Sequence, residues 1–304
     1  MSFVVGTALL AVVTALACAL PGAFVVLRKN SMLVDAIGHA VLPGIVVGYF
    51  FTHSLDSPLL IIGAALSGLV VVIGNEWLIR TGLVTGDAPQ GLIFPALFSV
   101  GVILVSTNFA HIHLDTHAVL VGDLNLAAWH QLTVGGVSIG PSYLYVMLAV
   151  LALNALFLAV FYSRLKVTTF DPQFARTLGM RVGLLNVSFM FLVSLTVVAA
   201  FNAAGAILVI ALMIVPGATA YLLSRRLPVM LALTVVFAVG GALGGFWIAY
   251  ALNAATSAGM AVFYGVVFVA VFIVMRLMRR RRTAHEQRPS QRLRASAARA
   301  APRV

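Results

Sequence analysis

Long apolar segments alternate with short polar breaks along most of the chain. When the segment ends are placed at charged and turn residues, nine spans are predicted, at residues 2–27, 34–53, 58–79, 91–107, 142–163, 183–202, 205–223, 228–251 and 260–278. Most are close to the ~20 residues that a helix needs to cross ~30 Å of hydrocarbon. The pattern predicts an all-α polytopic membrane protein with about nine transmembrane helices, in a range of eight to ten. The fourth span is the weakest of these assignments, because it is short and contains Pro95.

The basic residues give the predicted spans a direction. If the N-terminus lies outside, every Lys and Arg falls on the inner side. These residues are Arg28, Lys29, Arg80, those of the loop 164–182, the pair 225–226 and those from Arg276 onward. The outer breaks, at 54–57, 108–141, 203–204 and 252–259, contain no Lys or Arg. Because positive charge collects on the cytoplasmic side, we expect the N-terminus outside and the C-terminus in the cytoplasm.

Composition supports the membrane assignment and divides the chain. Hydrophobic residues make up 62% of the sequence and charged residues 9%. A soluble protein of this length does not need so large an apolar fraction to form its core. The net charge of +11 is concentrated, since ten of the 19 basic residues occur from Arg276 onward. We therefore expect a transmembrane domain at 1–280 and a basic, disordered cytoplasmic tail at 281–304 that is attracted to anionic membrane lipid. Nucleic acid is not expected as a partner.

Two ionisable residues fall inside the second predicted span. Asp35 and His39 are four residues apart, so a helix places them on one face. A carboxylate and an imidazole in this arrangement can bind a divalent transition metal, and Pro43 and Gly44 weaken the helix one turn later. The alternative is a hydrogen bond between the two side chains that only ties this helix to its neighbours.

The outer segment 108–141 is rich in histidine and aspartate. Its candidate metal ligands are His111, His113, Asp115, His117 and Asp123. Imidazole and carboxylate groups suit zinc and similar cations, although histidines are also ordinary in solvated loops. The single cysteine, Cys18, permits neither an intrachain disulfide nor a Cys-based metal cluster.

The inner loop 164–182 contains the signals of a short cytoplasmic helix. Asp171 suits the N-cap, Pro172 the first helical position and Gly179 the stop. Exposed Phe174 and Leu178 would serve little purpose alone, but they suit a knob that docks into a groove of a cytoplasmic partner. The residues assigned to this docking contact, which would couple the chain to its partner, are Phe170, Asp171, Pro172, Phe174, Arg176, Leu178 and Gly179.

These segments together carry a resemblance to a known family. The block from Asp35 to Gly44 that follows Arg28, the segment 171–179 and the helix 205–220 occur in the order of the permease subunit of ABC importers for zinc, manganese or iron. The resemblance runs from about residue 24 to residue 275. Three positions depart from the family pattern. Gln173 stands where Glu is frequent, Pro95 where a small polar residue is usual, and Val121 where Phe is usual.

The resemblance implies a set of partners and a location. It implies that 171–179 docks on two cytoplasmic ATPase subunits, that an extracytoplasmic metal-binding protein delivers the cargo, and that a second copy of the permease completes a homodimer. The Asp35 and His39 helix would form part of the metal route in a prokaryotic cytoplasmic (inner) membrane. The cargo would be a divalent ion, zinc or manganese and possibly iron, and no cofactor would be bound permanently.

The residues themselves address enzymatic activity. A P-loop needs a glycine-rich turn before its lysine, and neither Lys29 nor Lys166 follows glycine. An intramembrane metalloprotease would need a His-Glu-x-x-His helix, which the sequence lacks. We therefore expect a transport subunit, not an enzyme. An importer of a metal chelate such as cobalamin, haem or a siderophore is the nearest alternative, and an ion-gradient-driven secondary transporter is a more distant one. The histidine-rich outer segment favours zinc over manganese only weakly.

Overall fold

The computed structural model describes residues 2–53, 58–84, 86–108, 123–134 and 137–300, and all structural statements concern these residues. The long helices are α1 Phe3–Leu27, α4 Pro58–Arg80, α5 Ala88–Asn108, α8 Ser142–Phe170, α10 Val182–Ala204, α11 Ala206–Leu223, α12 Leu227–Ala251 and α13 Thr256–Ala300. Shorter helices are α2 Ser31–His39, α3 Val41–Thr52, α7 Leu124–Trp129 and α9 Pro172–Thr177, and the strands are β1 Gln131–Val134 and β2 Val137–Pro141.

In the described part of the chain, nine segments are long and apolar enough to cross a membrane. They coincide with the nine predicted spans, with α2 and α3 together forming the second. The predicted all-α membrane fold is confirmed. The fourth span also forms, because α5 continues through Pro95 from Ala88 to Asn108.

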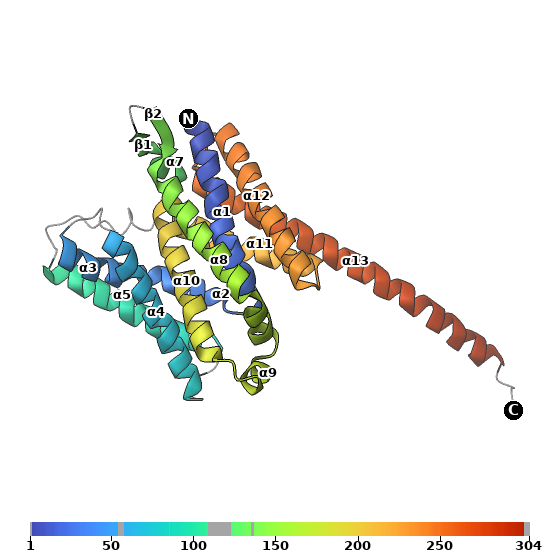
Figure 1. The fold of residues 1–304 in the computed structure, drawn as a ribbon. Helices are drawn as coiled ribbons and strands as arrows, with labels where there is room; N and C mark the ends of the chain where they lie inside the picture. Colours follow the sequence, from blue (N-terminus) through green and yellow to red (C-terminus); the bar gives the residue numbers. More distant parts are fainter. Residues whose placement is uncertain (1, 54–57, 85, 109–122, 135–136, 301–304) are drawn as a thin grey trace.

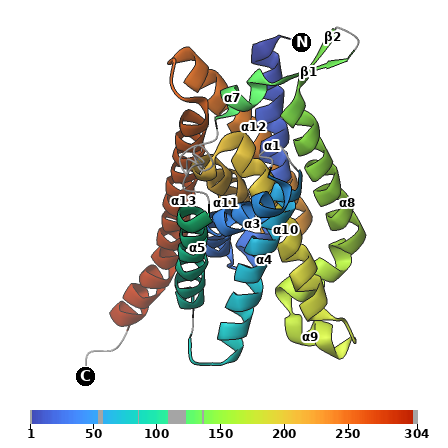
Figure 2. The ribbon, with the colours of Figure 1, turned by 90° about the vertical axis from the view of Figure 1, so that its left-hand side faces the viewer.

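The elements divide between two ends of the bundle. The N-terminus, α7 and the β1–β2 hairpin lie at one end, and α9 lies at the other (Figure 1). The turned view places the connection between α4 and α5 at the same end as α9 (Figure 2). The positive-inside pattern would make the α9 end cytoplasmic.

The antiparallel hairpin was not predicted from the sequence. Its register pairs Gln131 with Pro141 and Val134 with Val137, with an irregularity after Leu132. β-Branched residues such as Val134, Val137 and Ile139 favour strands, but a segment this short gives little periodicity.

The centre of the bundle is α1, which packs against α8, α10, α11 and α12. Small residues allow the closest crossings. A Cβ on Gly22 would overlap the Met213 backbone of α11, and one on Gly44 would overlap the Gly63 carbonyl of α4. Such contacts are typical of membrane helices, where packing replaces the hydrophobic effect as the driving force.

The last helix differs from the predicted tail. A disordered segment is predicted from residue 281, whereas α13 continues as helix to Ala300 and extends away from the other helices (Figure 1). Alanine and arginine are both strong helix formers, which favours this continuation even where apolar content is low. The division of the chain at residue 280 stays a prediction.

Candidate functional site

Helix α2 carries the predicted Asp35 and His39 pair. Most of the helix is buried, through Leu33, Val34, Ala36, Ile37 and Gly38. The two ionisable side chains are instead 38% and 45% exposed, respectively, and His39 Nε2 lies 3.6 Å from Asp35 Oδ1. Both therefore face out of a single subunit from the same side of the helix. The 3.6 Å separation is longer than a hydrogen bond, so each side chain keeps donor or acceptor capacity for a ligand.

The helix breaks directly after His39. Helix α2 ends at His39, Ala40 lies between the two helices, and α3 begins at Val41. The break was expected at Pro43 and Gly44, but it occurs three residues earlier. Proline lacks the N–H that would bond to the carbonyl four residues before, and its ring clashes with that carbonyl. The carbonyl concerned is that of His39, so the disruption falls on the turn that carries this residue.

The imidazole of His39 also has a packing partner. Phe94 of α5 stacks on it, with ring centroids 5.2 Å apart and an interplanar angle of 25°. Phe94 directly precedes Pro95, which connects the unusual proline of α5 with the candidate site. Stacking on an aromatic ring fixes the orientation of the imidazole plane without using either ring nitrogen.

Of the candidate outer ligands, only Asp123 lies in the described part of the chain. His111, His113, Asp115 and His117 lie outside the described residues. Asp123 is the N-cap of α7, where its carboxylate accepts a hydrogen bond from the Asn125 backbone N–H at 3.0 Å. Within the described ranges, no group of three or more His, Cys, Asp or Glu side chains could hold a metal. One subunit therefore brings together two of the predicted ligands, Asp35 and His39.

The predicted cytoplasmic helix forms as α9. The Asp171 carboxylate accepts a hydrogen bond from the Phe174 N–H at 2.8 Å, and Pro172 occupies the first turn. Gly179 ends the helix with a φ of 73°, and the Met180 N–H donates to the Ala175 carbonyl, as in a Schellman motif. Each signal read from the sequence therefore acts in the structure.

Three large apolar side chains are exposed on α9 and directly beside it, at one end of the bundle (Figure 1). Phe170, Phe174 and Leu178 are 60%, 53% and 54% exposed, while Ala175 is buried. The basic Arg176 also belongs to this segment. Large apolar side chains held out by a capped helix form a small, defined contact surface.

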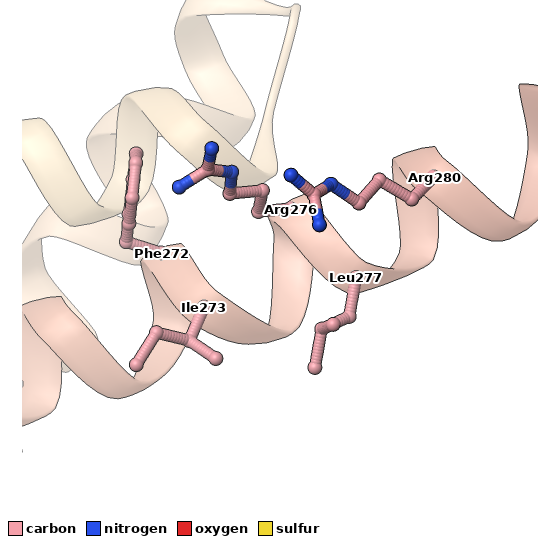
Figure 3. A pocket seen from close by; sticks show the side chains of 5 residues that line it. All are labelled: Phe272, Ile273, Arg276, Leu277 and Arg280. Carbon is pink, nitrogen blue, oxygen red and sulfur yellow. The ribbon is translucent and has the colours of Figure 1, made fainter.

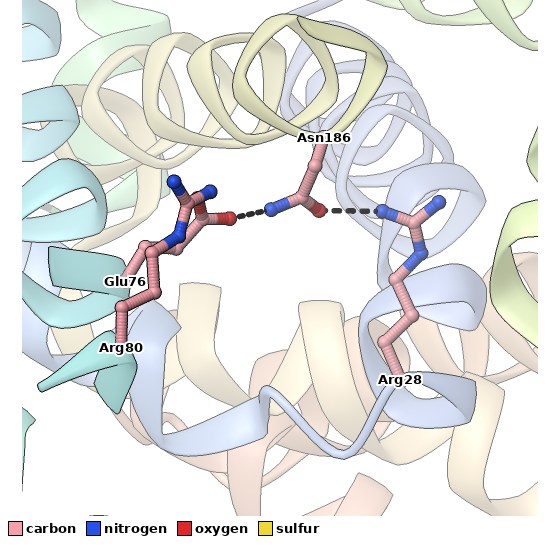
Figure 4. A network of polar contacts seen from close by, with 4 residues as sticks. All are labelled: Arg28, Glu76, Arg80 and Asn186. Carbon is pink, nitrogen blue, oxygen red and sulfur yellow. Dashed lines mark hydrogen bonds and ion pairs between the residues drawn. The ribbon is translucent and has the colours of Figure 1, made fainter. Parts of the chain in front are cut away.

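A polar network joins residues near the ends of α1 and α4 to the start of α10 (Figure 4). Arg28 donates to the Asn186 Oδ1 at 2.8 Å, and the Asn186 amide nitrogen donates to Glu76. Glu76 also pairs with Arg80, the residue four positions along α4, at 3.4 Å. The link to Arg28 was not predicted from the sequence, because its partners are more than 100 positions away.

A surface groove on α13 is a poorer candidate site. It is lined by Phe272, Ile273, Leu277, Arg276 and Arg280, with both guanidinium groups on one side of the helix (Figure 3). All five residues belong to a single helix, so no second element converges on the groove.

With the geometry established, comparison with known proteins decides the family. The model of the ABC 3 transport family matches residues 1–275. The chain belongs to the ABC 3 transport family. It is a multi-pass permease of an ABC transporter in a prokaryotic cytoplasmic membrane. The basic tail lies outside the matched region, as the resemblance implied.

Relatives span nearly the whole chain. The manganese transport system membrane protein MntD of Bacillus subtilis is 41% identical and covers 86% of this chain and 88% of its own. The zinc transport system membrane protein TroD of Treponema pallidum is 44% identical, covering 87% and 72%. Among solved structures, PsaBC from Streptococcus pneumoniae in complex with Fab superposes with a TM-score of 0.72 at 26% identity, covering 90% of this chain and 91% of its own. This ABC 3 permease shares its fold with that structure.

Proposed function

We propose that the protein imports a divalent transition-metal ion, zinc or manganese, through a pathway that Asp35 and His39 line. The observation that carries this proposal is the exposure of these two side chains on an otherwise buried helix of a membrane span. Charged groups inside a membrane are costly, so they face protein or water and commonly mark an ion pathway. The names of the relatives, manganese and zinc transport membrane proteins, support a metal ion over a chelate as cargo.

A second copy of the permease would complete the pathway. Asp35 and His39 are two ligands, and zinc takes four in a tetrahedral site. Two-fold symmetry would place the same pair on both sides of the axis and double the ligand number. A transported ion must bind weakly enough to leave, so a shared, partly hydrated site suits cargo better than a resident cofactor. We therefore propose a homodimer with no permanently bound metal.

The α9 segment is proposed to receive the motion that drives transport. Phe170, Phe174 and Leu178 form the contact surface, and Asp171, Pro172 and Gly179 hold it in shape. Two cytoplasmic ATPase subunits would dock there, one on each permease, and would supply the ATP hydrolysis for which this chain has no P-loop. The chain would be the transport subunit and the ATPases the enzymes. Arg176 supplies a charged neighbour for the apolar contact.

The opposite end is proposed to meet an extracytoplasmic metal-binding protein. The N-terminus, α7 and the hairpin lie together at the end opposite α9 (Figure 1). In the proposed orientation this end would be outside, and α9 and the C-terminus would be in the cytoplasm. The outer segment with His111, His113, Asp115, His117 and Asp123 would then lie where metal is delivered. Its lack of Lys and Arg leaves an approaching cation unrepelled. Arg276 and Arg280 would contact anionic lipid at the inner surface.

The cargo can be tested with the purified permease and its ATPase in proteoliposomes. We expect ATP-dependent uptake of Zn²⁺ or Mn²⁺, with the preferred ion excluding the other in competition. Uptake that needs no ATP but follows an imposed ion gradient would refute the ABC mechanism. Uptake of a haem or siderophore complex without uptake of either free ion would refute the proposed cargo.

The coupling role predicts a specific loss of assembly. Phe174→Ser combined with Leu178→Ser removes the apolar contact, and ATPase co-purification should fall by about tenfold or more while membrane abundance stays normal. Leu83→Ser is the matched control, because Leu83 is 88% exposed in the α4–α5 connection at the same end. Normal ATPase yield with the double variant would remove α9 from the coupling role.

A further inference from the structure

Arg28 joins three helices through one side chain. It follows α1 directly, and its Nε donates to the Thr169 Oγ1 at 3.0 Å. One terminal nitrogen donates to the Thr168 Oγ1 at 3.2 Å, and the other to the Asn186 Oδ1 at 2.8 Å. Its guanidinium carbon also lies 4.8 Å from the centre of the Phe189 ring. The planar guanidinium therefore uses all three of its nitrogens and one face, which a lysine cannot reproduce.

The acceptors lie on both sides of α9. Thr168 and Thr169 belong to the last turn of α8, immediately before the Asp171 cap. Asn186 lies near the start of α10, the helix that follows α9. Arg28 thus ties together the two helices between which α9 is suspended. A displacement of α9 that moves the end of α8 or the start of α10 must act on Arg28.

The connection from Arg28 to α2 is short and ordered. The Lys29 N–H donates to the Val26 carbonyl at 3.1 Å and the Asn30 N–H to the Val25 carbonyl at 3.1 Å. Lys29 adopts the left-handed conformation with a φ of 59°, which completes a Schellman ending without glycine. Helix α2 begins at Ser31, so only Lys29 and Asn30, both with defined backbone hydrogen bonds, separate Arg28 from the helix of Asp35 and His39. Because these hydrogen bonds hold the connector in one shape, a movement of Arg28 would also move α2, which a flexible loop would not ensure.

The network extends from Arg28 to another neighbour of α2. The Asn186 amide accepts from Arg28 on its oxygen side and donates to Glu76 of α4 on its nitrogen side (Figure 4). Helix α4 packs against both α2 and α3. Burial lowers the pKa of Arg28 to about 10, and attraction to Glu76 opposes that fall, so the group stays cationic at neutral pH.

We propose that Arg28 is a positioning residue for transport, which links the α8–α9–α10 segment to α2 so that movement of α9 is passed to Asp35 and His39. This inference rests on the proposed coupling role of α9 and on the proposed metal path. Arg28 would then connect the ATPase contact at α9 with the metal path at α2. A residue that only stabilised the fold would not affect the ratio of metal moved to ATP hydrolysed.

Arg28→Lys tests the link in the assembled transporter with its ATPase and metal-binding protein in proteoliposomes. The positive charge remains, but the three-way donation is lost. We expect normal membrane abundance and ATPase co-purification, with Zn²⁺ or Mn²⁺ moved per ATP falling about tenfold or more, as expected when coupling between two sites is lost.

A second readout reports the position of α2 directly. Met32 is 54% exposed at the start of α2, so Met32→Cys in a Cys18→Ala background offers a thiol for a maleimide. In the otherwise unchanged transporter, trapping the ATPase with ATP and vanadate should change the reaction rate of this thiol. Adding Arg28→Lys should abolish that nucleotide response. A rate that still responds fully, or an unchanged metal-to-ATP ratio, would overturn the proposal.

Matched variants separate this proposal from general damage. Arg80→Lys is the control, since Arg80 belongs to the same network but is 74% exposed and pairs with Glu76 only at 3.4 Å. It should leave both readouts unchanged. If Arg28→Lys does not accumulate, Thr169→Val removes one acceptor at nearly constant volume and should lower the ratio in the same direction. An unchanged ratio with Thr169→Val would then count against the link.

The outcome also distinguishes failure of the link from failure of the underlying function. If α9 does not bind the ATPase, the serine double variant at Phe174 and Leu178 keeps normal co-purification. If α9 binds the ATPase but Arg28 is not the link, the double variant loses the ATPase while Arg28→Lys transports normally.

Discussion

Two groups of polar side chains within the bundle differ in how completely their hydrogen bonds are satisfied. Asn154 of α8 is fully buried, and its amide nitrogen donates to the Ala17 carbonyl and the Thr196 Oγ1, both at 2.9 Å. Asp35 and His39 are partly exposed and lie 3.6 Å apart. The first group joins three helices and leaves little capacity for a ligand. The second keeps its ligand capacity and presents it outside the subunit, which is the condition for a site completed by cargo or by a second copy.

The largest effect on transport is expected when the exposed pair, Asp35 and His39, is replaced. Asp35→Asn replaces a carboxylate by a weaker, neutral oxygen donor, and His39→Ala removes the imidazole. If the pair lines the metal path as proposed, metal uptake should fall by about 100-fold or more while abundance and ATPase association are preserved. Met32→Leu is the control, because Met32 is exposed on the same helix and its replacement keeps a large apolar side chain. Uptake is measured per transporter in the membrane, with abundance followed in parallel.

The pair would be structural if both variants accumulated normally and supported metal-limited growth at the unaltered rate. The metal route would then follow other residues. A loss of abundance in His39→Ala alone would point to the stacking on Phe94, and Asp35→Asn would still test the ligand role.

The buried group should respond in the opposite way. Asn154→Leu leaves the Ala17 carbonyl and the Thr196 hydroxyl without this partner, and we expect a loss of ~1–3 kcal/mol of stability. Thermal unfolding in detergent should shift to lower temperature, while uptake per folded transporter stays within about twofold of the original. Unchanged stability with strongly reduced uptake would show that Asn154 belongs to the transport path.

The sequence was sufficient for features that depend on local pattern. Hydropathy located the nine spans, and Asp171, Pro172 and Gly179 located α9, because caps and stops act within a few residues. It was less precise for the break after His39, since Pro43 exerts its effect on the preceding turn.

Long-range contacts were beyond the local pattern. Arg28 meets Thr169 across 141 positions and Asn186 across 158, and hydropathy carries no information on such pairs. Stacking of Phe94 on His39 was missed for the same reason. Asp35 and His39 were proposed as a site because they are four apart on one helix, but their exposure depends on which neighbours cover α2. The candidate residues could thus be proposed from the sequence, whereas the face they occupy needed the fold.

The smallest effect on stability is expected at Thr14, a buried polar residue that, unlike Asn154, has no hydrogen-bond partner among the described residues. Thr14 lies on α1, three residues before Ala17, and its hydroxyl is buried with no hydrogen-bond partner among the described residues. Thr14→Val replaces that hydroxyl by a methyl group of similar size. Because no bond is lost and an unpaired polar group is removed, stability should stay within ~0.5 kcal/mol or rise slightly, and uptake should not change. The same detergent unfolding measurement as for Asn154→Leu provides the comparison. A destabilisation as large as that of Asn154→Leu would mean that the Thr14 hydroxyl has a partner in the membrane-embedded transporter, and that the distinction drawn from the isolated subunit is incomplete at this position.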